Sequence, residues 1–193
     1  MAPVRHTPCA GDLMRIFAEH TIAIGIDYQE RLIPAINENS IVIRNSRILF
    51  SGLKLLQVPA IVSRQYPKGL GDTVAEIREV TDTAAVLDKT SFSCYGDAGI
   101  RQALEHSGRT TIILGGTEAH VCVLQTAVDL RAAGYQVIYV VDCMGSRTTE
   151  DKQYGLKRAA QEGALLVTYE QILFELLGSA TAPAFKDISK LVK

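Results

Sequence analysis

The chain has 193 residues, of which 47% are apolar and 21% are charged. Such a length suits one domain that can bury roughly 70% of its unfolded surface, so no disulfide scaffold or structural metal is required. Twenty basic and 21 acidic residues leave a formal charge of -1. This balance argues against a nucleic-acid footprint and against a polybasic membrane-binding surface.

The four cysteines are Cys9, Cys94, Cys122 and Cys143, and none forms a C-x-x-C pair. Their low density is typical of reduced, intracellular thiols rather than of a disulfide scaffold. The first residues lack the apolar core of a signal peptide, and no run approaches the ~18 apolar residues of a membrane span. We expect a cytoplasmic protein with no membrane contact.

Short runs rich in Ile and Val recur along the chain and predict strands. Most of them lack the polar-apolar alternation of a half-exposed strand, which favours a parallel sheet covered on both faces. The predicted strands comprise residues 21–27, 60–64, 85–89, 110–114, 136–142 and 164–168.

The longer segments between these runs place apolar residues at helical spacing. Thr148, followed three residues later by Asp151, is a capping-box signal for a helix start. Gly134, Gly163 and Gly178 are typical helix ends. The predicted helices comprise residues 40–56, 121–133, a segment from Thr148 to Gly163, and 170–177.

Six strands alternating with helices predict an α/β fold of three layers, with a doubly wound six-stranded parallel sheet between helices. We expect one domain over residues 1–193, with residues 1–18 as an N-terminal extension. The tail, residues 179–193, carries an apolar stripe that predicts a short helix. That helix would dock on its own domain or on a neighbouring subunit.

Reactive side chains follow three of the predicted strands. Asp27 ends the first strand, Lys89 ends the third, and residues 115–122 follow the fourth. In parallel sheets of this type, sites lie beyond the carboxyl ends of the strands near the topological switch point. We therefore expect these residues to meet at one edge of the sheet.

Cys122 is the predicted nucleophile. It falls in the first turn of a predicted helix, where free backbone N–H groups and the helix dipole favour a thiolate, and Lys89 would lower the thiol pKa further. Asp27 would act as general base and acid. A cysteine in a buried helix is more often a core residue, and the matching Asp and Lys are what favour the catalytic interpretation.

These residues occur in blocks that resemble the isochorismatase-like cysteine hydrolases, a family that includes nicotinamidases and carbamoylases. The resemblance extends from about residue 21 to residue 178, in the family's order. The matching blocks are Ile26-Asp27-Tyr28-Gln29, Lys89-Thr90-Ser91-Phe92-Ser93 and Gly116-Thr117-Glu118-Ala119-His120-Val121-Cys122-Val123, then Thr126-Ala127-Val128-Asp129-Leu130, Gly134-Tyr135, and Asp142 with Ser146-Arg147.

The resemblance implies a hydrolase with a triad of Asp27, Lys89 and Cys122. It also implies a cis peptide at Thr117–Glu118 and an oxyanion site formed around Thr117, Glu118, Val121 and Cys122. Residues 65–71 and the tail are similar to the isochorismatase-domain-containing subgroup, whose substrate is unsettled. A cysteine triad suits attack on a small amide or related carbonyl compound, with a thioester on Cys122, whereas isochorismate hydrolysis cleaves a vinyl ether.

Nicotinamidases of this family hold a metal with an Asp and two His after the second strand. Here residues 63–68 contain no histidine, and the four histidines of the chain form no ligand pair (His6, His20, His106, His120). We expect neither a metal nor an organic cofactor, and nicotinamide becomes a poor first guess for the substrate.

Other residues near these blocks have two interpretations each. Tyr28, Tyr66 and Phe92 are either walls of the substrate pocket or ordinary core and interface aromatics. Gln29 either contacts substrate or binds nearby backbone. We assign all four to substrate binding as a working prediction.

His120 invites a Cys–His dyad with Cys122, but packing or a supporting hydrogen bond is favoured because neighbouring helix residues point apart. Glu118 either belongs to the oxyanion site or fixes the tight turn. Cys94 either faces the pocket or is inert packing.

Three functional hypotheses remain open. The first is a metal-independent cysteine hydrolase of a small-molecule substrate, acting as a homo-oligomer (dimer or tetramer) without nucleic acid. The second is a non-catalytic interaction protein that retains the fold and pocket. The third is a redox protein that pairs Cys122 with Cys94.

Overall fold

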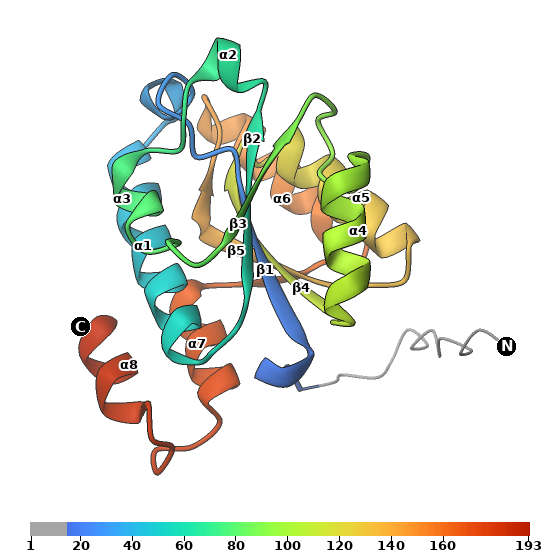
Figure 1. The fold of residues 1–193 in the computed structure, drawn as a ribbon. Coiled ribbons are helices and arrows are strands. Elements are labelled where there is room, and N and C mark those ends of the chain that lie inside the picture. The colour runs from blue at the N-terminus through green and yellow to red at the C-terminus, as the bar shows by residue number, and fades with distance from the viewer. Residues whose placement is uncertain (1–14) are drawn as a thin grey trace, which may run out of the picture.

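The computed structural model describes residues 15–193 (Figure 1). Cys9 and most of the expected N-terminal extension lie outside the described residues. The core is a six-stranded sheet in the order β3-β2-β1-β4-β5-β6, and every strand pair is parallel. The strands are β1 (Thr21–Ile26), β2 (Ala60–Gln65), β3 (Ala85–Lys89), β4 (Thr111–Thr117), β5 (Gln136–Gly145) and β6 (Leu165–Val167).

Helices cover both faces of this sheet, so the predicted three-layer α/β fold is confirmed. Apolar side chains of α4, α5 and α6 pack on one face. Those of α1, α3, α7 and α8 pack on the other. The helices are α1 (Asn39–Leu55), α2 (Pro67–Leu70), α3 (Ala75–Arg78), α4 (Ala98–Ser107), α5 (Cys122–Ala132), α6 (Thr149–Gln161), α7 (Tyr169–Leu177) and α8 (Phe185–Leu191), with 3-10 turns η1 (Ala18–His20) and η2 (Ile33–Ala35).

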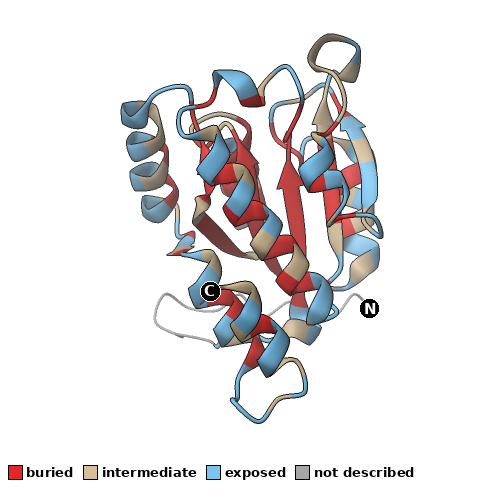
Figure 2. Cartoon of the chain, turned by 90° about the vertical axis from the view of Figure 1, so that its left-hand side faces the viewer, coloured by how far each residue is buried: buried red, intermediate tan, exposed pale blue. Residues whose placement is uncertain are grey.

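Burial explains why most strands read as continuous apolar runs. All residues of β1 and β4 are buried, and Figure 2 shows the sheet buried between helices whose outer faces are exposed. Strand β3 at the edge is largely exposed and carries Val86 at 50% exposure. The switch point of the sheet lies between β1 and β4, whose carboxyl ends are therefore adjacent.

Strand β4 extends three residues beyond its predicted end. Gly115 and Gly116 pair with Gly25 and Ile26 of β1, and Thr117 pairs with Gly145 of β5. Gly116 has φ 140°, and a Cβ added there would lie 2.1 Å from the Ile26 carbonyl oxygen. Since L side chains avoid this conformation, glycine at 116 allows β4 to continue to Thr117 past the register shift between Leu114 and Gly116.

The helix ends follow local signals closely. The Thr148 side chain accepts a hydrogen bond from the Asp151 amide at the start of α6, and Gly178 ends α7 in the left-handed conformation. Helix α4 was not predicted, although Asp97 caps it by accepting from the amides of Gly99 and Ile100.

The tail forms α8, which packs on α1 and α7 and buries Ile188 completely. Within residues 15–193, none of the helices combines the length and apolar character required to cross a lipid bilayer.

Candidate active site

Four strands deliver polar side chains to the edge of the sheet where α2 lies, at the top of Figure 1. Asp27 directly follows β1, Lys89 is the last residue of β3, and Thr117 is the last residue of β4. Ser63 comes from β2, which lies between β1 and β3. Cys122 begins α5, a short loop after β4. The structure thus places the three predicted triad residues at one edge.

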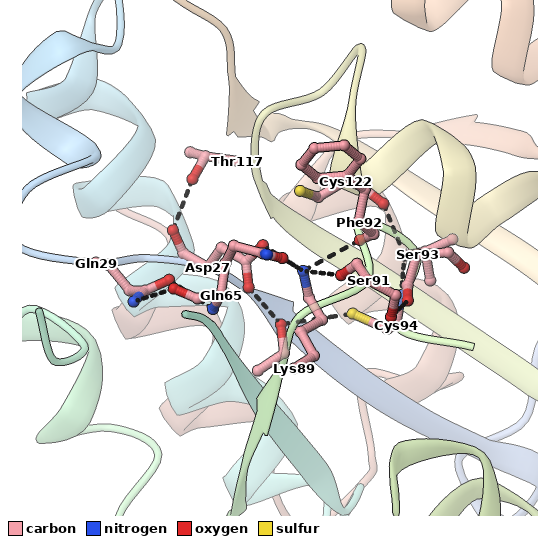
Figure 3. Close-up of polar contacts among 12 residues, drawn as sticks. Asp27, Gln29, Gln65, Lys89, Ser91, Phe92, Ser93, Cys94, Thr117 and Cys122 are labelled. Carbon is pink, nitrogen blue, oxygen red and sulfur yellow. Dashed lines mark hydrogen bonds and ion pairs between the residues drawn. The ribbon is translucent and has the colours of Figure 1, made fainter. Parts of the chain in front are cut away.

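Asp27 and Lys89 form a buried ion pair. The Lys89 Nζ atom lies 2.7 Å from Asp27 Oδ2, and both side chains are 0% exposed. Nζ also donates to Gln65 Oε1 at 2.7 Å and to the carbonyl oxygens of Ser91 at 3.3 Å and Phe92 at 3.1 Å (Figure 3). A buried charge pair is tolerated when such additional partners satisfy it, so Gln65 and the loop after β3 hold the ammonium in place.

The remaining atoms of Asp27 are also held. Ser63 Oγ donates to Oδ1 at 2.7 Å, and the Cys94 thiol donates to Ser63 Oγ at 3.5 Å. Thr117 Oγ1 donates to the main-chain oxygen of Asp27 at 2.7 Å. Asp27 itself has φ 53°, an uncommon conformation for a non-glycine residue. The carboxylate is therefore fixed in one orientation between β2, β3 and the Cys122 thiol.

Cys122 is nearly buried, with 6% of its surface exposed. Burial raises the pKa of its thiol to about 12, and the negative charge of Asp27 acts in the same direction, while Lys89 opposes them more weakly. The prediction of a lowered pKa was therefore wrong, because desolvation and the charge of Asp27 together outweigh the Lys89 ammonium. The Cys122 thiol thus lies close enough to the Asp27 carboxylate for the two side chains to interact.

The loop before Cys122 contains a cis peptide bond between Thr117 and Glu118. The Val121 amide donates to the Glu118 carbonyl oxygen at 3.0 Å, and the Val123 amide donates to the same oxygen at 3.2 Å. Val121 therefore has no free N–H for an oxyanion, which corrects that prediction. Within residues 15–193 the Cys122 amide makes no hydrogen bond, so it remains available to an incoming oxygen.

Two predicted substrate contacts are wrong. Tyr28 is 0% exposed and packs on the α1 side of the sheet, where its hydroxyl bonds to Ser46 Oγ and to the Cys143 carbonyl oxygen. Gln29 is likewise 0% exposed. Its amide donates to the carbonyl oxygens of Gln65 and Gly71 and accepts from the Gln65 amide, so its hydrogen-bonding groups serve the backbone.

Tyr66 and Phe92 lie at the surface near Lys89, with exposures of 56% and 54%. Tyr66 borders a cavity of about 350 Å³, which also involves Pro67, Lys68, Asp88, Lys89, Thr90 and Asp97. Phe92 contributes its carbonyl oxygen to Lys89. Both aromatic rings are thus available to a ligand, as a pocket wall requires.

The other ambiguous residues have supporting contacts. His120 Nδ1 lies 2.9 Å from Ser146 Oγ, which agrees with a supporting hydrogen bond rather than a Cys–His dyad. Cys94 is 0% exposed, and burial raises the pKa of its thiol to about 11. Cys94, Cys122 and Cys143 are all free thiols. In the described part of the chain, no group of three or more His, Cys, Asp or Glu residues is arranged to hold a metal ion.

Ser63 and Gln65 were missed as site residues. The sequence segment that contains them was considered for the histidines that it lacks and, from Gln65 on, for the resemblance to one subgroup, and neither residue was assigned to the site. Ser63 is a polar residue within an apolar predicted strand and Gln65 directly follows that strand, which is the signal that could have identified them. Their partners, Asp27 and Lys89, lie 36 and 24 residues away in sequence, so the contacts depend on the sheet register.

Comparisons with known proteins agree with this fold. The isochorismatase domain family matches residues 21–171. The isochorismatase domain-containing protein 1 of Salmo salar is 39% identical over 173 residues, which are 90% of this chain and 61% of that protein. This chain thus spans about three fifths of that relative's length. The isochorismatase domain-containing protein 2 of Bos taurus is 37% identical over 94% of this chain and 87% of its own.

A solved structure is similar as well. The MAR1 ribonuclease of Caenorhabditis elegans superposes with a TM-score of 0.88 at 37% identity, over 93% of this chain and 92% of that one. Similarity of this extent, from β1 into α7, goes beyond a shared architecture. The chain belongs to the isochorismatase family.

Proposed function

We propose that this protein is a cysteine hydrolase that acts on a small amide or related carbonyl compound, without a metal ion, through a thioester on Cys122. The observation that carries the proposal is the buried Asp27–Lys89 pair, with a Ser63 donor on one carboxylate oxygen and the Cys122 thiol beside it. Because the Asp27 carboxylate is enclosed in this way, we expect it to act as a base toward one nearby proton, that of the Cys122 thiol.

The reaction begins with transfer of the thiol proton to Asp27 as the Cys122 sulfur bonds to the substrate carbonyl carbon. The carbonyl oxygen takes the negative charge and accepts a hydrogen bond from the free Cys122 amide. Asp27 then gives the proton to the leaving amine nitrogen, and the C–N bond breaks. A thioester remains on Cys122.

Water completes the cycle. Asp27 takes a proton from the water, whose oxygen bonds to the thioester carbon, and the C–S bond then breaks. The sulfur regains its proton from Asp27, and a carboxylic acid leaves. The raised pKa of Cys122 fits this sequence because the thiol stays protonated until a substrate is present. Lys89 stabilises the charges that form beside it.

A small molecule is the substrate that we favour over a nucleic acid. A cavity of about 350 Å³ opens beside Lys89, with an exposed aromatic side chain, Tyr66, at its border. Its lining includes Lys89 but neither Asp27 nor Cys122, so a substrate would have to extend from it to the thiol. The formal charge of -1 offers little attraction to phosphates. Because one relative of known structure is named a ribonuclease, RNA belongs in the substrate screen, and cleavage of RNA without cleavage of any amide or ester would reject our proposal.

The other two hypotheses make different predictions. A non-catalytic interaction protein would bind ligands in the cavity without turnover. A redox protein would form a Cys94–Cys122 disulfide under mild oxidation. We retain the expectation of a cytoplasmic homo-oligomer.

The proposal is tested by trapping the acyl enzyme. The protein is incubated with para-nitrophenyl acetate and with a panel of small amides, quenched in acid during turnover, digested and analysed by mass spectrometry. We expect an acyl group on the peptide that contains Cys122 and none on those that contain Cys94 or Cys143. Turnover without acylation of Cys122 would contradict the mechanism.

Replacing Ser63 by alanine should slow turnover by about tenfold, since Asp27 loses a hydrogen bond of roughly 1.5 kcal/mol to a charged group. Ser46→Ala is the matched control, because Ser46 is an equally buried serine whose hydroxyl serves Tyr28 on the opposite face of the sheet. We expect kcat/KM to fall in the first variant and to stay near wild type in the second. Equal rates in both variants would exclude a role for Ser63 in catalysis.

A further inference from the structure

The nucleophile loop, residues 118–121, is bound residue by residue to the end of β5 and the segment after it. The Ala119 amide donates to the Gly145 carbonyl oxygen at 2.8 Å. His120 Nδ1 lies 2.9 Å from Ser146 Oγ. The Arg147 backbone amide and Nε both donate to Glu118 Oε2, at 3.1 and 3.0 Å. Residues 118–120 thus have polar partners in residues 145–147.

Burial distinguishes these contacts from ordinary surface bonds. Ser146 is 1% exposed, and the Glu118 side chain is 11% exposed although its partner Arg147 is 61% exposed. The carboxylate is therefore enclosed by the loop that it fixes. A largely buried carboxylate such as that of Glu118, with two donors on one oxygen, is more restrained than a carboxylate in a surface ion pair.

Two further contacts hold the same loop from the same side. The Tyr139 hydroxyl, from β5, donates to the Ala119 carbonyl oxygen. Helix α6 approaches so closely at Gly155 that an added Cβ would lie 2.9 Å from the Cα of His120. Ser146 is in turn held by the backbone amide of Asn37, which donates to the Ser146 carbonyl oxygen at 2.9 Å. The segment that supports the loop is therefore fixed by a neighbouring part of the chain.

Within residues 15–193, the hydrogen bonds that residues 145–147 make toward the site end on the loop, and none ends on Cys122, Asp27 or Lys89. Yet Cys122 follows the loop directly, so the position of the loop sets where the sulfur and the free Cys122 amide stand relative to Asp27. We infer that Ser146 and Arg147 are positioning residues of the hydrolytic site, which act through the nucleophile loop. This inference rests on the proposed function, and it adds a support from β5 to a site built by β1–β4.

The expected consequence is a defect in rate rather than in binding. A displacement of about 1 Å between reacting groups can cost on the order of 100-fold in rate. The cavity lined by Tyr66 and Lys68 lies between α2 and the end of β3, and its lining does not include residues 145–147. Loosening the loop should therefore lower kcat and leave KM near its wild-type value.

The test compares Arg147→Ala and Ser146→Ala with Arg158→Ala. Arg158 is the matched control, because its Nε donates to Glu162 Oε1 at 2.6 Å within α6 and it is 56% exposed. With para-nitrophenyl acetate, we expect kcat to fall on the order of 10-fold to 100-fold in the first two variants, and not in the control. A Glu118→Ala, Arg147→Ala cycle should be non-additive, with the double variant no slower than Glu118→Ala.

A second measurement does not require turnover. A loosened loop exposes the Cys122 sulfur, and the thiolate is the form that alkylates. Iodoacetamide should therefore modify Cys122 faster in Arg147→Ala than in wild type or Arg158→Ala, while kcat changes in the opposite direction. A merely destabilised protein would also alkylate Cys143 faster, which we do not expect.

Unchanged kcat and unchanged alkylation of Cys122 in both variants would overturn the inference, as would additive effects in the cycle. Failure of the proposed function looks different. In that case wild type does not acylate Cys122, whereas the alkylation comparison still decides whether Ser146 and Arg147 hold the loop.

Discussion

Replacing Cys122 by alanine is expected to abolish turnover, with a loss on the order of 10⁴-fold or more, because the nucleophile is removed. The fold should remain, since Cys122 is 6% exposed and the substitution deletes one sulfur atom at the start of α5. A cost of about 1 kcal/mol is expected from the small space left behind. Initial rates with para-nitrophenyl acetate and the thermal midpoint measure the two effects.

Cys143→Ala is the matched control for this variant. Cys143 is also a buried free thiol, but it packs on the α1 side of the sheet among side chains that do not touch Asp27. It should lose some stability and keep its rate per folded molecule. Hydrolysis that persists in Cys122→Ala would remove the thioester mechanism altogether.

Replacing Lys89 by methionine is expected to abolish turnover and to destabilise the fold by about 3–5 kcal/mol, which is the usual cost of breaking a buried ion pair from one side. The variant leaves the Asp27 carboxylate at 0% exposure without its cation. Urea unfolding followed by circular dichroism gives the free energy of unfolding, and the loss should appear in the midpoint.

Asp27→Asn should lower stability less than Lys89→Met. In Asp27→Asn, the Lys89 ammonium can still donate hydrogen bonds to the oxygens of Gln65, Ser91 and Phe92. The Asp27 carboxylate, by contrast, has no other cation within 4 Å among the described residues. Lys54→Met, which breaks an exposed pair with Asp82, serves as the surface control and should hardly change unfolding. Equal losses in Lys89→Met and Lys54→Met would show that the buried pair contributes nothing.

The positions of the strands and the helix caps could be predicted because they depend on neighbours in sequence, although β4 and β5 each extend three residues beyond their predicted ends. Continuous apolar runs identify strands covered on both faces, and Thr148 with Asp151 marks the start of α6. The positions of Asp27 and Lys89 follow from the same logic, because each directly ends an apolar run. The extension of β4 through Gly116 was not predictable, since it depends on pairing with β1 and β5.

Side-chain direction was the main failure in the site. The left-handed conformation of Asp27 turns the chain after β1, so Tyr28 enters the core on the α1 side and Gln29 binds backbone near β2. Neither outcome can be derived from residue type. Ser63 and Gln65 were missed for a related reason, because a polar residue in a strand acquires its partner from the neighbouring strand.

The sequence by itself determined which chemistry-bearing residues this protein has and at which ends of which elements they stand: an Asp after β1, a Lys at the end of β3 and a Cys at the start of a helix. Only the tertiary structure decided their state. Burial raises the pKa of Cys122 to about 12, where its local position predicted a lowered value, and desolvation is a property of the assembled core. Residues 145–147 became part of the site in the same way, because the sheet register places them against the nucleophile loop.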